Sequence, residues 1–380
     1  MNATPSQAQR RHGARAPRTV SLALSGGNAL GAYAGGAIEA LEQAGIRFDV
    51  LSGASIGAVS AAIVAGNPPG LAGDALRAFW AVASSGPGGA WPGLSSGRAR
   101  ELVNGGHALR TVLFGRPGLF SPRPTGFLSL LPGMPPDVAL FDSRPIAATL
   151  ERLVDFDRLN DARSPRLVVA AVDVESGEAV YFDSRRDRIT PRHLLASTGF
   201  LPSFPPVDID GRLLGDPGLL CNLPLDPILI GETGDRLCFL VDLYSAEGPR
   251  PRSLDTSLER AQDIVFSAQT SRTLQAFRRE QRLRHLLERA PRTAARDRLP
   301  PPGQVDIVIA AYRALPHELA AKALEYSAAS LGERWDAGRR DMEAGLDALS
   351  GGRPDIGDLG FSLYRGQASA AATAPSGPVS

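Results

Sequence analysis

The sequence predicts a three-layer α/β fold built on a largely parallel central sheet. Three observations predict it: short apolar stretches typical of buried strands, longer stretches with apolar residues at helical spacing, and the alternation of the two along the chain. The chain has 380 residues, of which 43% are hydrophobic and 21% charged, so it can bury a sizeable core. Its two cysteines exclude a disulfide framework and suit a reducing compartment.

The N-terminal part of the chain alternates strand and helix. Residues 20–24 form a short apolar stretch that stops at a Ser-Gly-Gly turn, and residues 30–45 carry apolar side chains at helical spacing. Residues 48–51 are a second strand candidate, followed by helical stretches at 58–65 and 71–83. A strand that leads directly into a helix is the repeating unit of a parallel sheet.

Residues 84–140 interrupt this alternation. They are rich in Gly and Pro and carry isolated large apolar residues, so we expect an irregular insertion rather than further regular elements. The apolar residues at 114–134 are compatible with a substrate channel or lid, with a small satellite core, or with a dimer surface.

Beyond residue 140 the alternation resumes. Arginines between 272 and 284 interleave with Leu and Phe, which fits a solvated helix face or docking on an anionic membrane. The expected elements are helices at 144–153, 254–288 and 318–349 and strands at 166–173, 179–183, 237–241 and 305–311.

The charge balance argues against nucleic acid as a partner. Lys and Arg number 41 against 40 Asp and Glu, a formal net charge of +1, whereas a protein that neutralises many phosphates carries a basic excess.

The first 18 residues lack the apolar core of a secretory signal, and no stretch approaches the ~18 apolar residues of a transmembrane helix. We therefore expect a cytoplasmic protein.

Residues 53–57 read Gly-Ala-Ser-Ile-Gly, the G-x-S-x-G pattern of a nucleophile elbow. An apolar strand precedes them and an apolar helix follows, as an elbow requires. Such a turn exposes the hydroxyl of Ser55, and the helix N-terminus favours negative charge developing beside it. A plain strand–turn–helix with an incidental serine is the alternative.

Residues 25–31, Ser-Gly-Gly-Asn-Ala-Leu-Gly, form a glycine loop between the first strand and the first helix. Backbone N–H groups of such a loop can hold an anion, so it predicts either an oxyanion hole or a phosphate cradle for NAD or NADP. The spacing is not G-x-G-x-x-G, and Asp49 lies at the start of the second strand instead of its end, so the nucleotide interpretation is the weaker one. A third interpretation of the glycine loop is close packing of the helix on the sheet.

A serine nucleophile needs a base. His317 follows the late strand, as an α/β-hydrolase histidine would, but too few strands precede Ser55 for that fold. A carboxylate with a raised pKa can replace histidine. Asp216 is the best candidate because it ends an apolar strand within Leu-Leu-Gly-Asp-Pro-Gly, although the same residues also suit a plain turn.

Taken together and in order, these segments resemble the motifs of patatin-like phospholipases. Additional segments resemble a bacterial subgroup that carries a C-terminal domain of unknown function, and the resemblance spans about residues 19–345. The family motifs are residues 24–33, 53–57, 196–197, 204–207 and 216–218 with Asn222 and Pro224, and the subgroup motifs are 66–69, 322–327 and 334–338.

The resemblance implies a three-layer α/β/α patatin-like fold and hydrolysis of acyl esters, typically of lipids, through an acyl-enzyme and without a metal or cofactor. On this interpretation Ser55 is the nucleophile and Asp216 is its general base in a Ser–Asp dyad. The backbone amides of Gly26, Gly27 and Asn28 form the oxyanion hole. The partner is a lipid or other acyl ester, with peripheral contact to a membrane or lipid granule left open.

The resemblance also divides the chain. Residues 19–245 are expected to form the catalytic domain, with an insertion at about 84–140. A mainly helical C-terminal extension at 246–350 follows. Disordered or flexible tails are expected at 1–18 and 351–380.

Three residues depart from the family pattern. Asn28 replaces the third glycine of the loop, Leu30 replaces its usual basic residue, and Pro217 replaces the glycine after Asp216. Loss of the cation weakens the case for a phosphate head group, and Pro217 stiffens the turn that carries the base. Pro217 and Leu30 motivate the alternative of a catalytically weak binding protein associated with lipid or storage granules.

Overall fold

The computed structural model of the chain describes residues 18–84, 97–231, 233–291 and 301–366. The predicted N-terminal tail lies outside the described residues except for Arg18, as does the predicted C-terminal tail beyond residue 366. Residues 85–96 of the predicted insertion also lie outside them.

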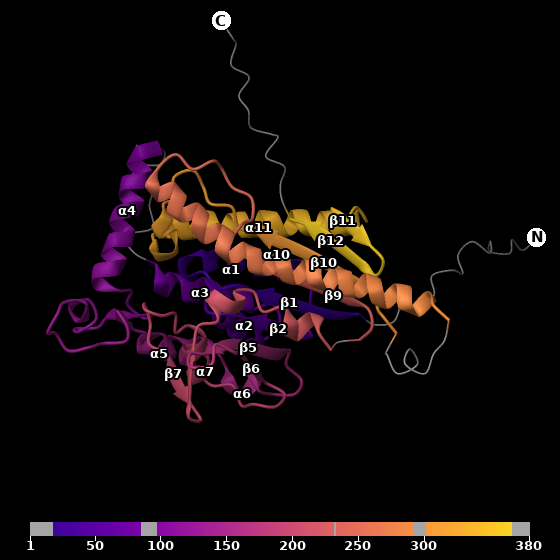
Figure 1. Cartoon of the computed structure of the whole chain (residues 1–380), viewed down its shortest axis with the longest axis horizontal. Helices are drawn as coiled ribbons and strands as arrows, with labels where there is room; N and C mark the ends of the chain where they lie inside the picture. The colour runs from indigo at the N-terminus through magenta and orange to yellow at the C-terminus, as the bar shows by residue number, and fades with distance from the viewer. Residues whose placement is uncertain (1–17, 85–96, 232, 292–300, 367–380) are drawn as a thin grey trace, which may run out of the picture.

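The main sheet is largely parallel, and its strands run in Figure 1 from the yellow C-terminal edge to the magenta middle of the chain. The six strands from β12 to β5 are parallel to one another. The other pairings are antiparallel: β11 with β12, β6 and β8 with β5, and β7 with β8. The strand order is β11 (Ile356–Asp358), β12 (Phe361–Arg365), β10 (Val305–Ala311), β9 (Arg236–Asp242), β1 (Thr19–Leu24), β2 (Val50–Gly53), β5 (Arg166–Asp173), β8 (Arg212–Gly215) and β7 (Val207–Ile209), with β6 (Ala179–Asp183) also paired to β5.

Helices follow most strands. None in the described part of the chain combines the length and the apolar composition needed to cross a membrane. They are α1 (Gly31–Gln43), α2 (Ile56–Ala65), α3 (Ala72–Ala83), α4 (Gly97–Phe114), α5 (Arg144–Leu153), α6 (Phe156–Leu159), α7 (Pro191–Ser197), α8 (Gly218–Cys221), α9 (Asp226–Leu229), α10 (Leu254–Arg289) and α11 (Ala328–Ser350), with short 3-10 turns η2 (Asn28–Leu30), η3 (Leu128–Leu130) and η5 (Ala320–Leu324) and a small hairpin of β3 (Ser121–Pro122) and β4 (Phe141–Asp142).

Alternate residues of the strands pack on opposite faces of the sheet. Leu22 and Leu24 of β1 belong to a large buried cluster that includes residues of α1, α2 and α11. Ala23, between them, belongs to a second cluster with Leu274 and Phe277 of α10. Because side chains alternate across a strand, helices cover both faces. The predicted three-layer α/β/α fold with a largely parallel sheet is therefore confirmed.

Helices α1 and α11 cross with their backbones in contact. A Cβ atom on Gly36 of α1 would lie 1.8 Å from the carbonyl oxygen of Trp335. One on Gly338 of α11 would lie 1.9 Å from the carbonyl oxygen of Tyr33. Beside this crossing the Tyr33 hydroxyl donates a hydrogen bond to Asp341 at 2.7 Å. Helix α11 therefore packs in direct backbone contact with α1, the helix that follows the glycine loop.

The C-terminal region contributes strands as well as helices. β10 pairs in parallel with β9, and β12 pairs in parallel with β10. Sequence analysis expects a mainly helical extension followed by a flexible tail from residue 351, whereas residues 356–365 contain the last two strands of the main sheet. These strands are short and bordered by Gly and Pro, so their pairing with β10 depends on contacts that a local pattern does not report.

The stretch expected to be irregular also contains a long helix, α4. Its sequence carries little hydrophobic periodicity, and Gly105 and Gly106 lie in its middle, which lowers its intrinsic helix propensity. α4 packs against η5 in the C-terminal region. Tertiary packing of this kind stabilises helices whose own sequence is a weak helix former.

Substitution at the crossing tests how tightly the C-terminal helix is held. Gly338→Ala should lower the free energy of unfolding by about 3 kcal/mol, because the new methyl group meets backbone that cannot move aside. Gly332→Ala is the matched control: it lies on the same helix in open space and should stabilise by about 0.5–1 kcal/mol. Urea denaturation measures both, and a Gly338→Ala protein as stable as wild type would contradict the close crossing.

Candidate active site

The glycine loop, Ser55 and Asp216 each follow the end of a strand. The loop follows β1, Ser55 follows its neighbour β2, and Asp216 follows β8 on the far side of β5. When the pairings of β2 and β8 with β5 are each continued past the last paired residue, Ser55 and Asp216 both fall level with Ala171. The sheet register therefore brings together two residues that are far apart in sequence.

Ser55 occupies a strained turn between β2 and α2. Its φ is 54° and its ψ −129°, a backbone conformation that non-glycine residues rarely adopt. The turn is tight, because a Cβ atom on Gly57 would lie 2.3 Å from the carbonyl oxygen of Leu24. The Ser55 N–H donates to the Ser197 hydroxyl oxygen at 2.9 Å. These contacts hold the Ser55 side chain at the cavity described below.

Asp216 is a buried carboxyl group that faces Ser55. The Gly218 N–H donates to its Oδ1 at 2.8 Å, and the Ser55 hydroxyl also interacts with the carboxyl group. Burial raises the pKa of Asp216 to about 7, although both hydrogen bonds act to lower it. A carboxylate with a pKa near neutrality is suited to accept a proton from a hydroxyl group at physiological pH.

Gly26 brings the glycine loop against Ser55. Its N–H donates to the Asn222 carbonyl oxygen at 3.1 Å, and the Asn222 side-chain amide donates back to the Gly26 carbonyl oxygen at 3.1 Å. A Cβ atom at Gly26 would lie 2.9 Å from the Cβ atom of Ser55 and 2.6 Å from Asn222 Oδ1. Only glycine fits here, and its own N–H is already engaged.

The next two residues of the loop keep their N–H groups available. Within the described ranges, neither the Gly27 N–H nor the Asn28 N–H has a hydrogen-bond acceptor. Both lie at the start of η2, where N–H groups lack an acceptor within the helical turn. Of the three predicted oxyanion-hole residues, Gly27 and Asn28 thus have free donors.

These groups line a cavity of about 520 Å³. Ser55, Asp216 and the glycine loop form part of its wall, and most of the remaining lining side chains are apolar. Most of the apolar residues come from four separated parts of the chain, within 119–146, 198–204, 258–266 and 323–326, and Ile56, Leu219 and Tyr244 add to them. A mostly apolar cavity of this size with a few converging polar groups is typical of a small-molecule site.

Sequence analysis assigns no role to several residues that the structure places here. Ser197 and Asn222 stand in the motif segments quoted above, but their contacts with Ser55 and Gly26 depend on the folded chain. Tyr326 and the lining residues of α10 lie in the region expected to be a separate extension. Their proximity to the glycine loop could not be predicted from spacing.

Two residues weighed in the alternative interpretations lie elsewhere. His317 hydrogen bonds with Glu333 at 3.0 Å and is not among the residues that line the cavity. Asp49 accepts a hydrogen bond from the Val20 N–H at 2.8 Å, near the end of β1 opposite the glycine loop. In the described part of the chain, no group of three or more His, Cys, Asp and Glu residues is arranged to hold a metal ion.

Comparison with family models identifies the class of protein. A model described as "Patatin-like phospholipase" matches residues 22–229, and a second, DUF3734, described as "Patatin phospholipase", matches residues 264–351. The first match covers more than half of the chain, and the chain belongs to the patatin-like phospholipase family. The predicted resemblance, including the C-terminal domain of unknown function, is confirmed.

Several solved structures are similar to this chain. VipD from Legionella pneumophila has 16% identity and a TM-score of 0.41, covering 88% of this chain and 68% of that one. The type III effector ExoU has 15% identity and a TM-score of 0.35, covering 88% and 53%. ExoU in complex with SpcU from Pseudomonas aeruginosa has 18% identity and a TM-score of 0.31, covering 69% and 52%. Among curated protein sequences no significant match was found.

The raised pKa of Asp216 predicts a pH-dependent stability. Because burial raises this pKa from 3.8 to about 7, folding of the wild-type protein takes up a proton between these values. The contribution of Asp216 to the free energy of unfolding should therefore fall, by on the order of 4 kcal/mol, as pH rises from about 4 to about 7.

Asp216→Asn cannot titrate at this position and should lack that decrease. Urea denaturation of both proteins across this pH range measures the difference between their free energies of unfolding. If the difference stays constant with pH, the Asp216 carboxyl group ionises as it would in the unfolded chain.

Proposed function

We propose that this protein hydrolyses carboxylic esters of lipids through an acyl-enzyme on Ser55, with Asp216 as general base. The observation that carries the proposal is the contact between the Ser55 hydroxyl group and a buried carboxyl group whose pKa is raised to about 7. The contact lies in the wall of a mostly apolar cavity. A hydroxyl group next to such a base is an activated nucleophile.

The reaction follows from this arrangement. Ionised Asp216 accepts the Ser55 proton as the serine oxygen attacks the ester carbonyl carbon, and the resulting oxyanion lies against the N–H groups of Gly27 and Asn28. The ester C–O bond then breaks, and the leaving alcohol takes the proton from Asp216. In the second half, Asp216 accepts a proton from water as the water oxygen attacks the acyl-enzyme carbonyl carbon. The bond to the Ser55 oxygen then breaks, Asp216 returns the proton to Ser55, and the carboxylic acid is released.

The cavity favours the acyl part of a substrate over a charged head group. None of the residues that line it in the described chain is Lys, Arg or His, and Leu30, which replaces the family's basic residue, is buried. A phosphate group would be desolvated there without a cation to balance its charge. We infer that neutral acyl esters are the preferred substrates.

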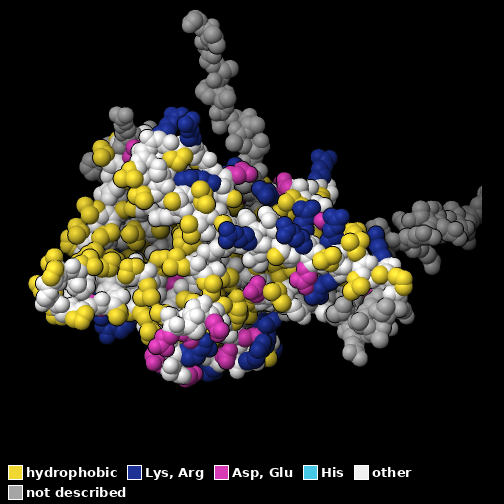
Figure 2. All heavy atoms as spheres, viewed as in Figure 1, with side chains coloured by type: hydrophobic (Ala, Val, Ile, Leu, Met, Phe, Trp, Pro, Cys, Tyr) yellow, Lys and Arg dark blue, Asp and Glu magenta, His cyan; other side chains and the backbone are white. Residues whose placement is uncertain are grey.

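The rim of the cavity is apolar and exposed. Leu219, Leu258 and Val265 line it, yet their exposed fractions are 68%, 52% and 51%. Figure 2 shows hydrophobic side chains gathered on the left part of one face. Exposed apolar residues around the mouth of a lipid-binding cavity favour peripheral contact with a lipid surface.

Pro217 is compatible with activity. It lacks an N–H, but the hydrogen bond to the Asp216 carboxyl group comes from the next residue, Gly218. The turn that holds the base is therefore complete. A binding protein without turnover remains the second candidate because Leu30 removes a cation, and it predicts lipid binding without ester hydrolysis.

Removal of the nucleophile tests the proposal. Ser55→Ala should lower the hydrolysis of p-nitrophenyl butyrate by at least about 1,000-fold, because the oxygen that attacks the ester is removed. Ser60→Ala is the matched control: its hydroxyl group donates to the Ile56 carbonyl oxygen within α2, and it should keep wild-type activity. Full activity in Ser55→Ala would refute the assignment.

The pH profile tests the base. Only ionised Asp216 can accept the proton, so kcat/KM should rise with pH and level off above about 7. Below that value it should fall about tenfold per pH unit, as expected for one ionisation. Steady-state assays with a substrate that does not titrate measure this. A profile that is level from pH 5 upward would exclude a base with a raised pKa.

A further inference from the structure

Asn28 adopts a backbone conformation that needs support. Its φ is 54°, in the left-handed region that glycine adopts freely and that asparagine adopts less readily than glycine but more often than most other residues. Its side chain is not free, because the Tyr326 hydroxyl group donates to Asn28 Oδ1 at 3.0 Å. Tyr326 is 1% exposed, lies between η5 and α11, and lines the cavity. A residue from the C-terminal region therefore holds the residue that carries one of the free N–H groups.

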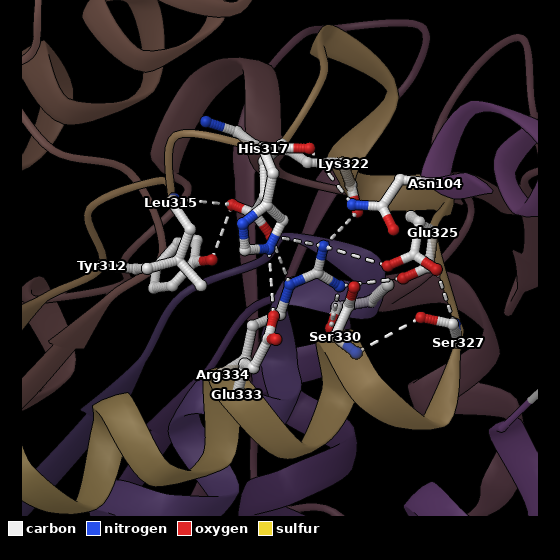
Figure 3. A network of polar contacts seen from close by, with 12 residues as sticks. Asn104, Tyr312, Leu315, His317, Lys322, Glu325, Ser327, Ser330, Glu333 and Arg334 are labelled. Carbon is white, nitrogen blue, oxygen red and sulfur yellow. Dashed lines mark hydrogen bonds and ion pairs between the residues drawn. The ribbon is translucent and has the colours of Figure 1, made fainter. Parts of the chain in front are cut away.

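A buried guanidinium group fixes the backbone that leads into Tyr326. Arg334 of α11 is fully buried and donates to the Glu318 carboxylate at 2.8 Å. It also donates to the carbonyl oxygens of Lys322 and Glu325, at 3.0 and 2.8 Å, just before Tyr326 in the chain. It also donates to the carbonyl oxygen of Ala29, at 3.3 Å, in the glycine loop. Figure 3 shows the polar network around Arg334.

The Tyr326 ring is also fixed from the side. The buried Arg116 guanidinium group lies over it, 5.7 Å from the ring centroid, and Phe120 meets it edge-on at 6.3 Å. The hydroxyl group thus points at Asn28 from a ring with little freedom to move. A hydrogen bond from a fixed donor is better able to hold a strained residue than one from a mobile side chain.

We propose that Tyr326 is a positioning residue for the oxyanion hole. By holding the Asn28 side chain, it keeps this residue in the left-handed conformation in which the N–H groups of Gly27 and Asn28 lack acceptors and are available to the oxyanion. The inference rests on the proposed function and deepens it. It explains how the loop functions with asparagine where the family pattern has glycine: the C-terminal region supplies the constraint.

This account predicts that the two residues are coupled. Glycine adopts a positive φ without support, so Asn28→Gly should make the loop less dependent on Tyr326. A merely structural role for the Tyr326 hydroxyl group would cost the same in both backgrounds. The double-mutant cycle of Tyr326→Phe and Asn28→Gly separates these outcomes.

In the kinetic test, kcat and KM are measured for hydrolysis of p-nitrophenyl butyrate by the four proteins of the cycle. Tyr326→Phe should lower kcat about tenfold with KM within about twofold, because the loss falls on the transition state. In the Asn28→Gly background, the same substitution should lower kcat by no more than about twofold, so its effect is at least about five times smaller. Tyr33→Phe, which loses the hydrogen bond to Asp341, is the control for loss of a buried tyrosine hydroxyl group and should keep wild-type kcat.

The inference fails if Tyr326→Phe keeps wild-type kcat, or if it costs the same factor in both backgrounds. A second measurement does not depend on activity. Hydrogen exchange of a peptide that covers residues 25–31 should be faster in Tyr326→Phe than in wild type and unchanged in Tyr33→Phe. Unchanged exchange in Tyr326→Phe overturns the inference, whereas an inactive wild-type protein with this exchange pattern overturns only the proposed function.

Discussion

A carboxyl group buried beside a serine hydroxyl group is the interaction on which the rest of this structure depends. The pKa of Asp216 is raised because its carboxyl group is removed from water, and the Ser55 hydroxyl group and the Gly218 N–H interact with that carboxyl group. The pair exists because β2 and β8 lie on the two sides of β5. Burial of an ionisable group costs free energy, and strongly perturbed pKa values of this kind cluster at functional sites.

The C-terminal region is part of the same unit as the glycine loop. Its strands β10, β11 and β12 extend the main sheet, α10 lines the cavity, and α11 crosses α1 with backbone contact. Lys322, the only lysine of the chain, is buried and pairs with Glu259 and Asp263 of α10, at 3.1 and 2.9 Å. A family domain and a domain of unknown function therefore share one core and one cavity.

The parts of the site that follow from local pattern could be predicted from the sequence. A serine between two glycines at a strand-to-helix turn, and a glycine loop after the first strand, are short-range signals, and the structure places both at one cavity. The helix α4 and the strands at 356–365 could not be predicted, because their stability comes from distant partners. The hydrogen bond between Tyr326 and Asn28 joins residues that are 298 positions apart, and a local sequence pattern cannot predict a contact between residues so far apart.

The central claim is that Ser55 becomes covalently acylated with help from Asp216. Mass spectrometry of the intact protein and its peptides after incubation with a fluorophosphonate tests this most directly, because the reagent reacts with activated serines. We predict a single adduct on the peptide that contains Ser55, formed far more slowly in Asp216→Asn. A folded protein that forms no adduct, an adduct on another residue, or equal rates in the two proteins would contradict the account.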